Sequence, residues 1–388
     1  MRVCGIIAEY DPFHLGHRFH LESARQLSGA DYVVVVLGGA FSQRGEAMLF
    51  STQDRARMAL LSGADLVLGM PVSFSCAQAN RFARGGISIL NALGAVSHLS
   101  FGCEPGGEAH LAAAAKRLYH PPRAFSDQLK NALKTGKSFA RAQGEALAGC
   151  LPEVPPGMFA QPNFILGTSY LLELHRLNSP IVPVPVPRMG GYHAQGLSPF
   201  PSATAVRRAL REGAWPGVAR ALPPESLTVL RDAAEKGRLH RAAALDSWLI
   251  GTLNTQGEVS LLSSPEMSEG LEQRILAKAR DAAGREELLA LVSTRRYTRA
   301  RVSRALSHAL LGLSHFPDRP EYARLLGFRR SAAPLLGRIK GTGFPLIHRP
   351  GREAPPGFAQ DMRAEEFWAL GAGMAPASAW RHRMTVID

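Results

Sequence analysis

The chain has 388 residues and a formal net charge of +13, with 46% hydrophobic and 20% charged residues. No stretch approaches the roughly 18 uninterrupted apolar residues of a membrane span. Glu9 and His14 follow the first apolar run too closely for a secretory signal. We therefore expect a globular cytoplasmic protein. The cysteines, at positions 4, 76, 103 and 150, form no CxxC pair, which argues against a disulfide framework or a zinc site and favours reduced thiols.

The first hundred residues alternate between apolar runs and amphipathic segments. Nearly continuous apolar runs predict strands covered on both faces at 3–8, 31–37, 64–68 and 96–101. The segments between them have helical spacing, at 16–27, 52–61 and 77–93. This order predicts an α/β fold with a doubly wound parallel sheet, in which ligands bind beyond the carboxyl ends of the strands.

Helices dominate the rest of the chain. We expect helical insertions within 104–160, a helix at 163–174, and a proline-interrupted strand at 180–187 that runs into Arg188. After a helix at 203–212, further helices are predicted at 225–238, 241–252, 270–284 and 297–313. We therefore place a domain boundary near residue 215, with an α/β domain at 1–215 and a mainly helical domain at 216–388.

Positive charge is clustered in one stretch of the second of these domains. Eleven Lys and Arg residues but only two acidic residues lie between Arg295 and Lys340. Such a cluster indicates a polyanionic partner, because arginine binds phosphates bidentately. The alternatives are the arginine bias of a GC-rich genome and an ordinary solvated helix face.

One segment after the first predicted strand has the composition of a phosphate site. Residues 9–17 read Glu-Tyr-Asp-Pro-Phe-His-Leu-Gly-His and open the next helix, whose free N–H groups and dipole attract anions. His14 and His17 can both donate to one phosphate chain, and Gly16 lets a nucleotide approach the backbone. The alternatives are a plain histidine pair on a helix face and a weak metal site. The chain contains neither GxGxxG nor a GxxxxGKS/T motif, which argues against dehydrogenases and P-loop enzymes.

Two motifs carry a resemblance to a known superfamily. Pro12-Phe-His-Leu-Gly-His17 resembles the HxGH signature of the HIGH nucleotidylyltransferases, and Ser202-Ala-Thr-Ala-Val-Arg207 resembles their second signature. Within this superfamily the chain is similar to the tRNA(Met) cytidine acetate ligase family. Further matching segments lie at 9–14, 43–46, 86–90, 101–102, 162–167 and 295–301.

The resemblance implies a fold, a reaction and partners. It implies a Rossmann-like sheet of the HIGH nucleotidylyltransferase type, whose domain at 1–215 binds ATP and joins it to acetate as acetyl-adenylate. On chemical grounds we expect Mg²⁺ with ATP, because the charge of the polyphosphate must be neutralised. The acetyl group would then pass to N4 of the wobble cytidine of elongator tRNA(Met), which the basic domain at 216–388 would contact. No oligomeric state follows from the sequence.

The resemblance also implies residue roles. His14, His17 and Arg207 would be catalytic, and the tRNA contacts would be Arg295, Arg296, Arg299, Arg301 and Arg304. The ATP contacts would include these two histidines and Ile7, Ala8, Glu9, Tyr10, Asp11, Pro12, Phe13, Leu15, Gly16, Arg18, Phe19, His20, Gly102, Asn163, Arg188, Ser202 and Thr204. From the residues alone, Arg188 is as readily a solvated arginine, and Asn163, Ser202 and Thr204 as readily cap helices.

Four positions depart from the family pattern. Asp11 stands where Asn is usual and adds an acid beside the phosphates, while Ala40, Gly69 and Phe164 replace a usual Asn, Glu and Asn. They leave two alternatives open, a small-molecule adenylyltransferase of the same superfamily and a non-catalytic RNA-binding relative. The basic second half argues against the first alternative, and the intact HxGH motif and Arg207 argue against the second.

Overall fold

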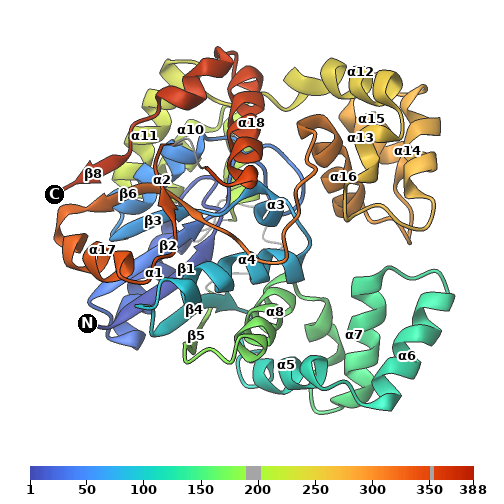
Figure 1. The fold of residues 1–388 in the computed structure, drawn as a ribbon, viewed down its shortest axis with the longest axis horizontal. Coiled ribbons are helices and arrows are strands. Elements are labelled where there is room, and N and C mark those ends of the chain that lie inside the picture. The colour runs from blue at the N-terminus through green and yellow to red at the C-terminus, as the bar shows by residue number, and fades with distance from the viewer. Residues whose placement is uncertain (189–201, 350–353) are drawn as a thin grey trace.

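The computed structural model describes residues 1–188, 202–349 and 354–388, and its centre is one eight-stranded sheet (Figure 1). The strand order is β5-β4-β1-β2-β3-β6-β7, with β8 also paired to β6. The first five strands run parallel to one another. They are β1 Val3–Ala8, β2 Tyr32–Leu37, β3 Leu66–Gly69, β4 His98–Cys103 and β5 Val182–Pro187. The predicted parallel sheet and its five strands are thus confirmed.

Helices cover both faces of this sheet because the strands are apolar on both sides. In β1, Cys4 and Ile6 face one core, and Val3 and Ile7 face the other. The first core is completed by α1 Leu15–Ser28 and α2 Thr52–Leu61, and the second by α4 Ala79–Ala92 and α8 Pro162–Arg176. A short helix, α3 Val72–Ser75, precedes α4. Alternate burial of this kind is the doubly wound arrangement that the sequence predicts.

The predicted insertion is a group of helices beside α8 (Figure 1). It consists of α5 Leu111–Tyr119, α6 Arg123–Lys134, α7 Phe139–Cys150 and the 3-10 turn η1 Pro156–Ala160. Helices α6 and α7 pack mainly on each other, and α5 packs on α8.

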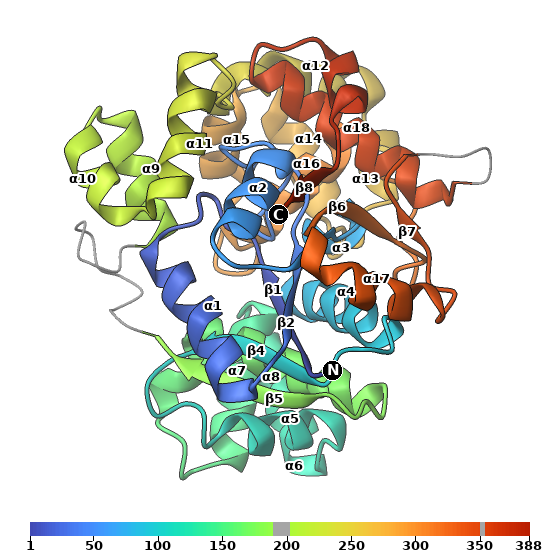
Figure 2. The same cartoon turned by 90° about the vertical axis from the view of Figure 1, so that its left-hand side faces the viewer.

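The helices after residue 202 form two groups. The first comprises α9 Ala203–Arg211, α10 Trp215–Ala221 and α11 Pro224–Glu235, which join the core of α1 and α2 and lie together in Figure 2. The second has a core of its own, made by η2 Ala242–Leu245, α12 Asp246–Gln256, α13 Val259–Leu262, α14 Leu271–Ala279, α15 Arg285–Val292 and α16 Arg299–Leu311. We call residues 245–311 the helical module. Among the described residues, no helix is both long and apolar enough to cross a membrane.

The end of the chain returns to the sheet, which the sequence analysis did not predict. Strand β6 Ala323–Arg329 pairs antiparallel with β3, and both β7 Leu346–Ile347 and β8 Thr385–Ile387 pair with β6. The remaining elements are η3 Arg330–Ala332, α17 Ala333–Lys340, α18 Pro356–Gly371 and η4 Pro376–Arg381. The region after residue 215 therefore contributes three strands as well as helices. The boundary near residue 215 stays a prediction.

Candidate active site

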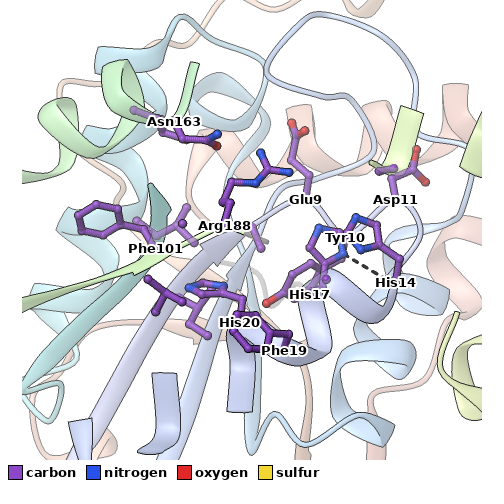
Figure 3. Close-up of a pocket in the computed structure, with 18 of the residues that line it drawn as sticks. Glu9, Tyr10, Asp11, His14, His17, Phe19, His20, Phe101, Asn163 and Arg188 are labelled. Atoms are coloured by element: carbon purple, nitrogen blue, oxygen red, sulfur yellow. Dashed lines mark hydrogen bonds between the residues drawn. The ribbon is translucent and has the colours of Figure 1, made fainter. Parts of the chain in front are cut away.

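The main pocket lies where the strand order reverses, at the carboxyl ends of β1, β4 and β5. Parallel α/β sheets bind ligands at this position because the adjacent loops leave in opposite directions. The cavity measures about 280 Å³. The predicted residues that line it are Ile7, Ala8, Glu9, Tyr10, Asp11, His14, Gly16, His17, Phe19, His20, Gly102, Asn163, Arg188 and Arg207. In Figure 3, Arg188 lies between Asn163 and Glu9, and His14, His17 and Tyr10 cluster together.

Four residues of the predicted ATP loop lie outside this lining, namely Pro12, Phe13, Leu15 and Arg18. Phe13 is fully buried and packs edge-on against the ring of Tyr10 at 4.7 Å. Arg18 is ion-paired with Glu225 of α11. Phe13 and Arg18 thus hold the loop and the first helix in place, and the assignment of these four residues as ATP contacts stays a prediction.

The sequence analysis also missed lining residues. They are Ile6, Gln43, Phe82, Phe101, Leu166, Tyr170, Val186, Pro187 and Ala203. Most are apolar residues of strand ends and of α4 or α8, which read as ordinary core positions in a sequence. They add apolar surface to a cavity that is also lined by histidines and arginines.

The two motif histidines form a stacked pair. The backbone N–H of His14 donates to Nδ1 of His17 at 3.3 Å, and the ring centroids are 3.6 Å apart. Because Nδ1 of His17 accepts this bond, a neutral His17 carries its proton on Nε2. Nε2–H is then the single donor of this ring.

The pocket holds its histidines neutral. Burial, with help from Arg188 and Arg207, lowers the pKa of His14 to about 3. Burial and the neighbouring His14 lower the pKa of His17 well below its usual range. Burial and Arg188 lower the pKa of His20 to about 4, and its Nε2 lies 3.1 Å from Oγ of Ser100. In the free protein, positive charge at this site therefore comes from arginines.

Asp11 acts as a structural anchor. Its two carboxylate oxygens accept the backbone N–H groups of Leu49 and Phe50 at 2.9 and 3.0 Å. Arg207 donates to the Asp11 carbonyl at 2.6 Å and lies 3.6 Å from the carboxylate. The carboxylate of Asp11, which the sequence places beside the phosphates, is thus hydrogen-bonded to two backbone amides and ion-paired with Arg207 of the second motif.

Arg55 of α2 is a second anchor, and the sequence analysis did not identify it. Its side chain is fully buried and donates to the carbonyl oxygens of Glu9, Gly38, Gly39 and Phe50. It also donates to Oγ1 of Thr52. Arg55 therefore ties together the loops that follow β1 and β2.

Glu9 and Asn163 are each held by a neighbour. Oε1 of Glu9 accepts the backbone N–H of Gln43 at 2.7 Å, and burial raises the pKa of this carboxyl. Oε1 of Glu104 accepts both N–H and Nδ2–H of Asn163, at 3.2 and 2.8 Å. Asn163 lies inside the first turn of α8, and Gln161 is the residue at the cap.

The second motif lies at the start of α9. Oγ of Ser202 accepts the backbone N–H of Ala205 at 3.1 Å, so Ser202 caps the helix. Nη2 of Arg207 donates to Oγ1 of Thr204 at 3.3 Å. Ser202 and Thr204 line a second cavity of about 740 Å³, which we call the outer cleft. It shares Glu9, His14, His17, Arg188 and Arg207, among others, with the main pocket.

The predicted tRNA contacts lie on the helical module, and only part of the set is accessible. Arg295, Arg296 and Arg299 are exposed. Arg296 and Arg301 pair with Glu269 at 2.8 and 3.5 Å, and Arg299 pairs with Glu286. These acids lie before residue 295, outside the sequence window that looked so basic.

The structure does not fit the predicted tRNA contact at Arg304. It is 8% exposed, and its guanidinium pairs with both carboxylate oxygens of Glu266 at 2.7 and 2.9 Å. It also donates to the carbonyl oxygen of Gln43 at 3.3 Å. A buried and paired arginine cannot contact a tRNA phosphate, so Arg304 joins the helical module to the loop after β2.

Comparisons with known proteins agree with these observations. A family model described as HIGH Nucleotidyl Transferase matches residues 1–379. The tRNA(Met) cytidine acetate ligase of Acetivibrio thermocellus is 35% identical, over 89% of this chain and 88% of that protein. That of Clostridium kluyveri is 33% identical over 95% of each chain. The crystal structure of Thermotoga maritima TmcAL bound with alpha-thio ATP has a TM-score of 0.90 at 27% identity, over 100% of both chains.

Proposed function

Because the chain belongs to the HIGH nucleotidyl transferase family and, within it, to the tRNA(Met) cytidine acetate ligases, we propose a two-step activity. The protein activates acetate with ATP and then acetylates a cytidine of tRNA(Met). The observation that carries the proposal is the stacked pair His14 and His17, with Arg188 and Arg207, in a pocket at the switch point of the sheet. A tRNA acceptor also agrees with the predicted cytoplasmic location, which stays a prediction.

The reaction proceeds in two steps. An acetate oxygen attacks the α-phosphorus of ATP, the bond between the α- and β-phosphates breaks, and pyrophosphate leaves. The N4 amine of the cytidine then attacks the acetyl carbonyl and loses a proton, and AMP leaves. The first step needs hydrogen-bond donors where negative charge builds up, and no nucleophilic side chain.

The pocket residues fit the first step. Nε2–H of His17 and the guanidinium groups of Arg188 and Arg207 are donors for the phosphates, and the apolar side beside Phe101 and Gly102 suits the adenosine. A Cβ on Gly102 would lie 3.2 Å from the side chain of Arg188, so glycine leaves this wall open. The roles of the individual residues stay predictions.

Mg²⁺ fits the site as a companion of ATP. The described residues include no group of three or more His, Cys, Asp and Glu side chains that could hold a metal by themselves. Mg²⁺ in such sites is commonly held by phosphates, water and one or two carboxylates, and Glu9 supplies a carboxylate to this pocket. The ion would neutralise charge on the phosphates.

The test is acetate-dependent exchange between ATP and pyrophosphate, followed by acetylcytidine formation on unmodified tRNA(Met). We expect both activities in the wild type and a loss of about 10²–10³-fold in exchange for His14→Ala. His120→Ala, at an exposed position of the insertion, is the matched control and should keep wild-type activity.

Each alternative gives a different result. Exchange with another acid and no response to tRNA would indicate a small-molecule adenylyltransferase. Salt-sensitive tRNA binding without any exchange would indicate a non-catalytic relative. Either outcome would overturn the proposed function.

A further inference from the structure

The outer cleft opens from the same wall as the main pocket and is larger, at about 740 Å³ against about 280 Å³. The loop after β2, the start of α8 and one side of α9 line it. The two cavities meet at Glu9, His14, His17, Arg188 and Arg207. A molecule in the outer cleft therefore reaches the groups that surround the phosphates of a nucleotide in the main pocket.

The outer cleft is lined by arginines. Beyond the shared wall, Arg44, Arg208 and Arg211 line it, and Glu46 is the acid there among the described residues. Within the shared wall, Asp11 is occupied by two backbone amides and Arg207. Arg211 is exposed and pairs with no acid within the described parts of the chain. The exposed guanidinium group of Arg211 is thus available to bind an anionic ligand.

These arginines stand on a rigid support. Val206 and Ala209 of α9 are buried in the core that also holds α1 and α2. Arg207 and Arg208 are adjacent, and Arg211 follows them by four and three residues. The three arginines therefore project from the side of α9 opposite Val206 and Ala209. Their backbone positions are set by packing before any ligand arrives.

We propose that the outer cleft binds the sugar–phosphate backbone of the RNA acceptor and leads the target base to the activated acetyl group. This inference rests on the proposed function. In the second step the attacking amine belongs to a polynucleotide, so its neighbouring phosphates must lie beside the nucleotide pocket. The arginines of the cleft favour contact with phosphates.

Inorganic pyrophosphate has related chemistry, and the test must separate it from RNA. The variants are Arg211→Ala and Arg44→Ala, which alter residues of the outer cleft that do not line the main pocket. The matched control is Arg220→Ala, an exposed arginine of α10 outside both cavities. The measurements are exchange kinetics without tRNA, the acetylation rate against tRNA concentration, and binding of a labelled anticodon stem-loop RNA at several salt concentrations.

We expect each variant to lower kcat/KM for tRNA by about tenfold and to reduce the salt dependence of RNA binding by about one phosphate contact. The exchange rate and the KM for pyrophosphate should not change. The Arg220→Ala control should match the wild type in all three measurements.

Two results would overturn the inference. If both variants bind the stem-loop RNA as the control does, the cleft is not an RNA site. If they raise the KM for pyrophosphate and lower exchange in parallel with acetylation, the cleft serves the leaving group instead. RNA binding is measured without turnover, so the inference is tested even if the wild type shows no exchange and the proposed function fails.

Discussion

Arg55 holds together the loops that form the rim of the pocket. Four carbonyl oxygens and one hydroxyl accept its N–H groups, and the side chain is fully buried. Replacing Arg55 by Met leaves these carbonyl groups buried without donors, so we expect a loss of about 3–5 kcal/mol in the free energy of unfolding. Urea unfolding measures it. Arg57→Met, on the exposed side of the same helix, is the control and should change stability little.

The depressed pKa values of the motif histidines predict how ATP affinity depends on pH. The pKa of His14 is about 3 in the free protein, and the negative charge of bound phosphates would raise it and that of His17. Between the free and the bound pKa values, binding takes up protons, so affinity increases as the pH falls.

Calorimetry in buffers of different ionisation enthalpy measures this uptake directly. We expect proton uptake on ATP binding between pH 6 and 7, and a smaller uptake for His14→Gln. A wild-type protein that binds ATP with no proton uptake would show that the histidines stay neutral in the complex.

At the scale of single residues, the sequence predicted those pocket residues that belong to short local motifs. The HxGH segment and Arg207 were found because their spacing is fixed along the chain, and both line the pocket. Arg55 was missed because its partners are backbone carbonyl groups of distant loops. Gln43 was missed because it acts through its backbone N–H, which donates to the carboxylate of Glu9. Arg304 was misjudged because its acid, Glu266, lies 38 residues away.

The loop after β2 is the element that connects the pocket with the helical module. The N–H of Gln43 holds Glu9, and the carbonyl oxygen of Gly45 accepts from Arg285, Ser303 and Ser307. Gly45 has φ of +77°, and a Cβ there would lie 2.4 Å from the backbone nitrogen of Arg304. The loop can approach α16 this closely only with glycine.

Gly45→Ala should therefore separate this loop from α16. We expect a loss of several kcal/mol in unfolding free energy, above the roughly 1 kcal/mol cost of a left-handed alanine, and weaker ATP binding through Glu9. Gly106→Ala is the matched control, with φ of +79° and no atom within 4 Å of its Cβ. Equal losses in the two variants would show that only backbone strain matters at Gly45.

A strand or helix was predictable where its own residues show the hydrophobic pattern of that element. The β-branched runs of β1 and β2 predicted both strands closely, since each strand is apolar on two faces. Strand β6 reads Ala-Arg-Leu-Leu-Gly-Phe-Arg and has no such pattern. It is a strand because β3 offers it an edge, and that partner lies more than 250 residues earlier.

The molecule as a whole should lose stability in mild acid. Burial lowers the pKa of His20, His240 and His308 to about 4 and that of His14 to about 3. These groups bind protons near pH 6.5 in the unfolded chain but not in the folded one, so their contribution is complete above pH 6.5 and falls below it. Burial also lowers the pKa of His17, which adds a fifth histidine. Asp361, with a pKa raised to about 6 by burial, and Glu9, whose pKa burial also raises, act in the opposite direction. The five histidines outweigh these two carboxyl groups.

Urea unfolding at pH 7, 6 and 5 checks this expectation. Each such histidine contributes about 1.4 kcal/mol per pH unit once the unfolded form is protonated. The variant His308→Gln should reduce the slope by about one proton. A stability that is constant from pH 7 to pH 5 would contradict the assignment of neutral buried histidines.

The antiparallel pairing of β6 with β3 has a consequence for how the protein is made. The ribosome releases β3 long before β6, so a growing chain exposes the backbone of a hydrophobic strand until residue 329 has emerged. An open strand edge of this kind is a site for misassociation between nascent chains. We therefore expect nascent chains to associate most readily before β6 has emerged and paired with β3.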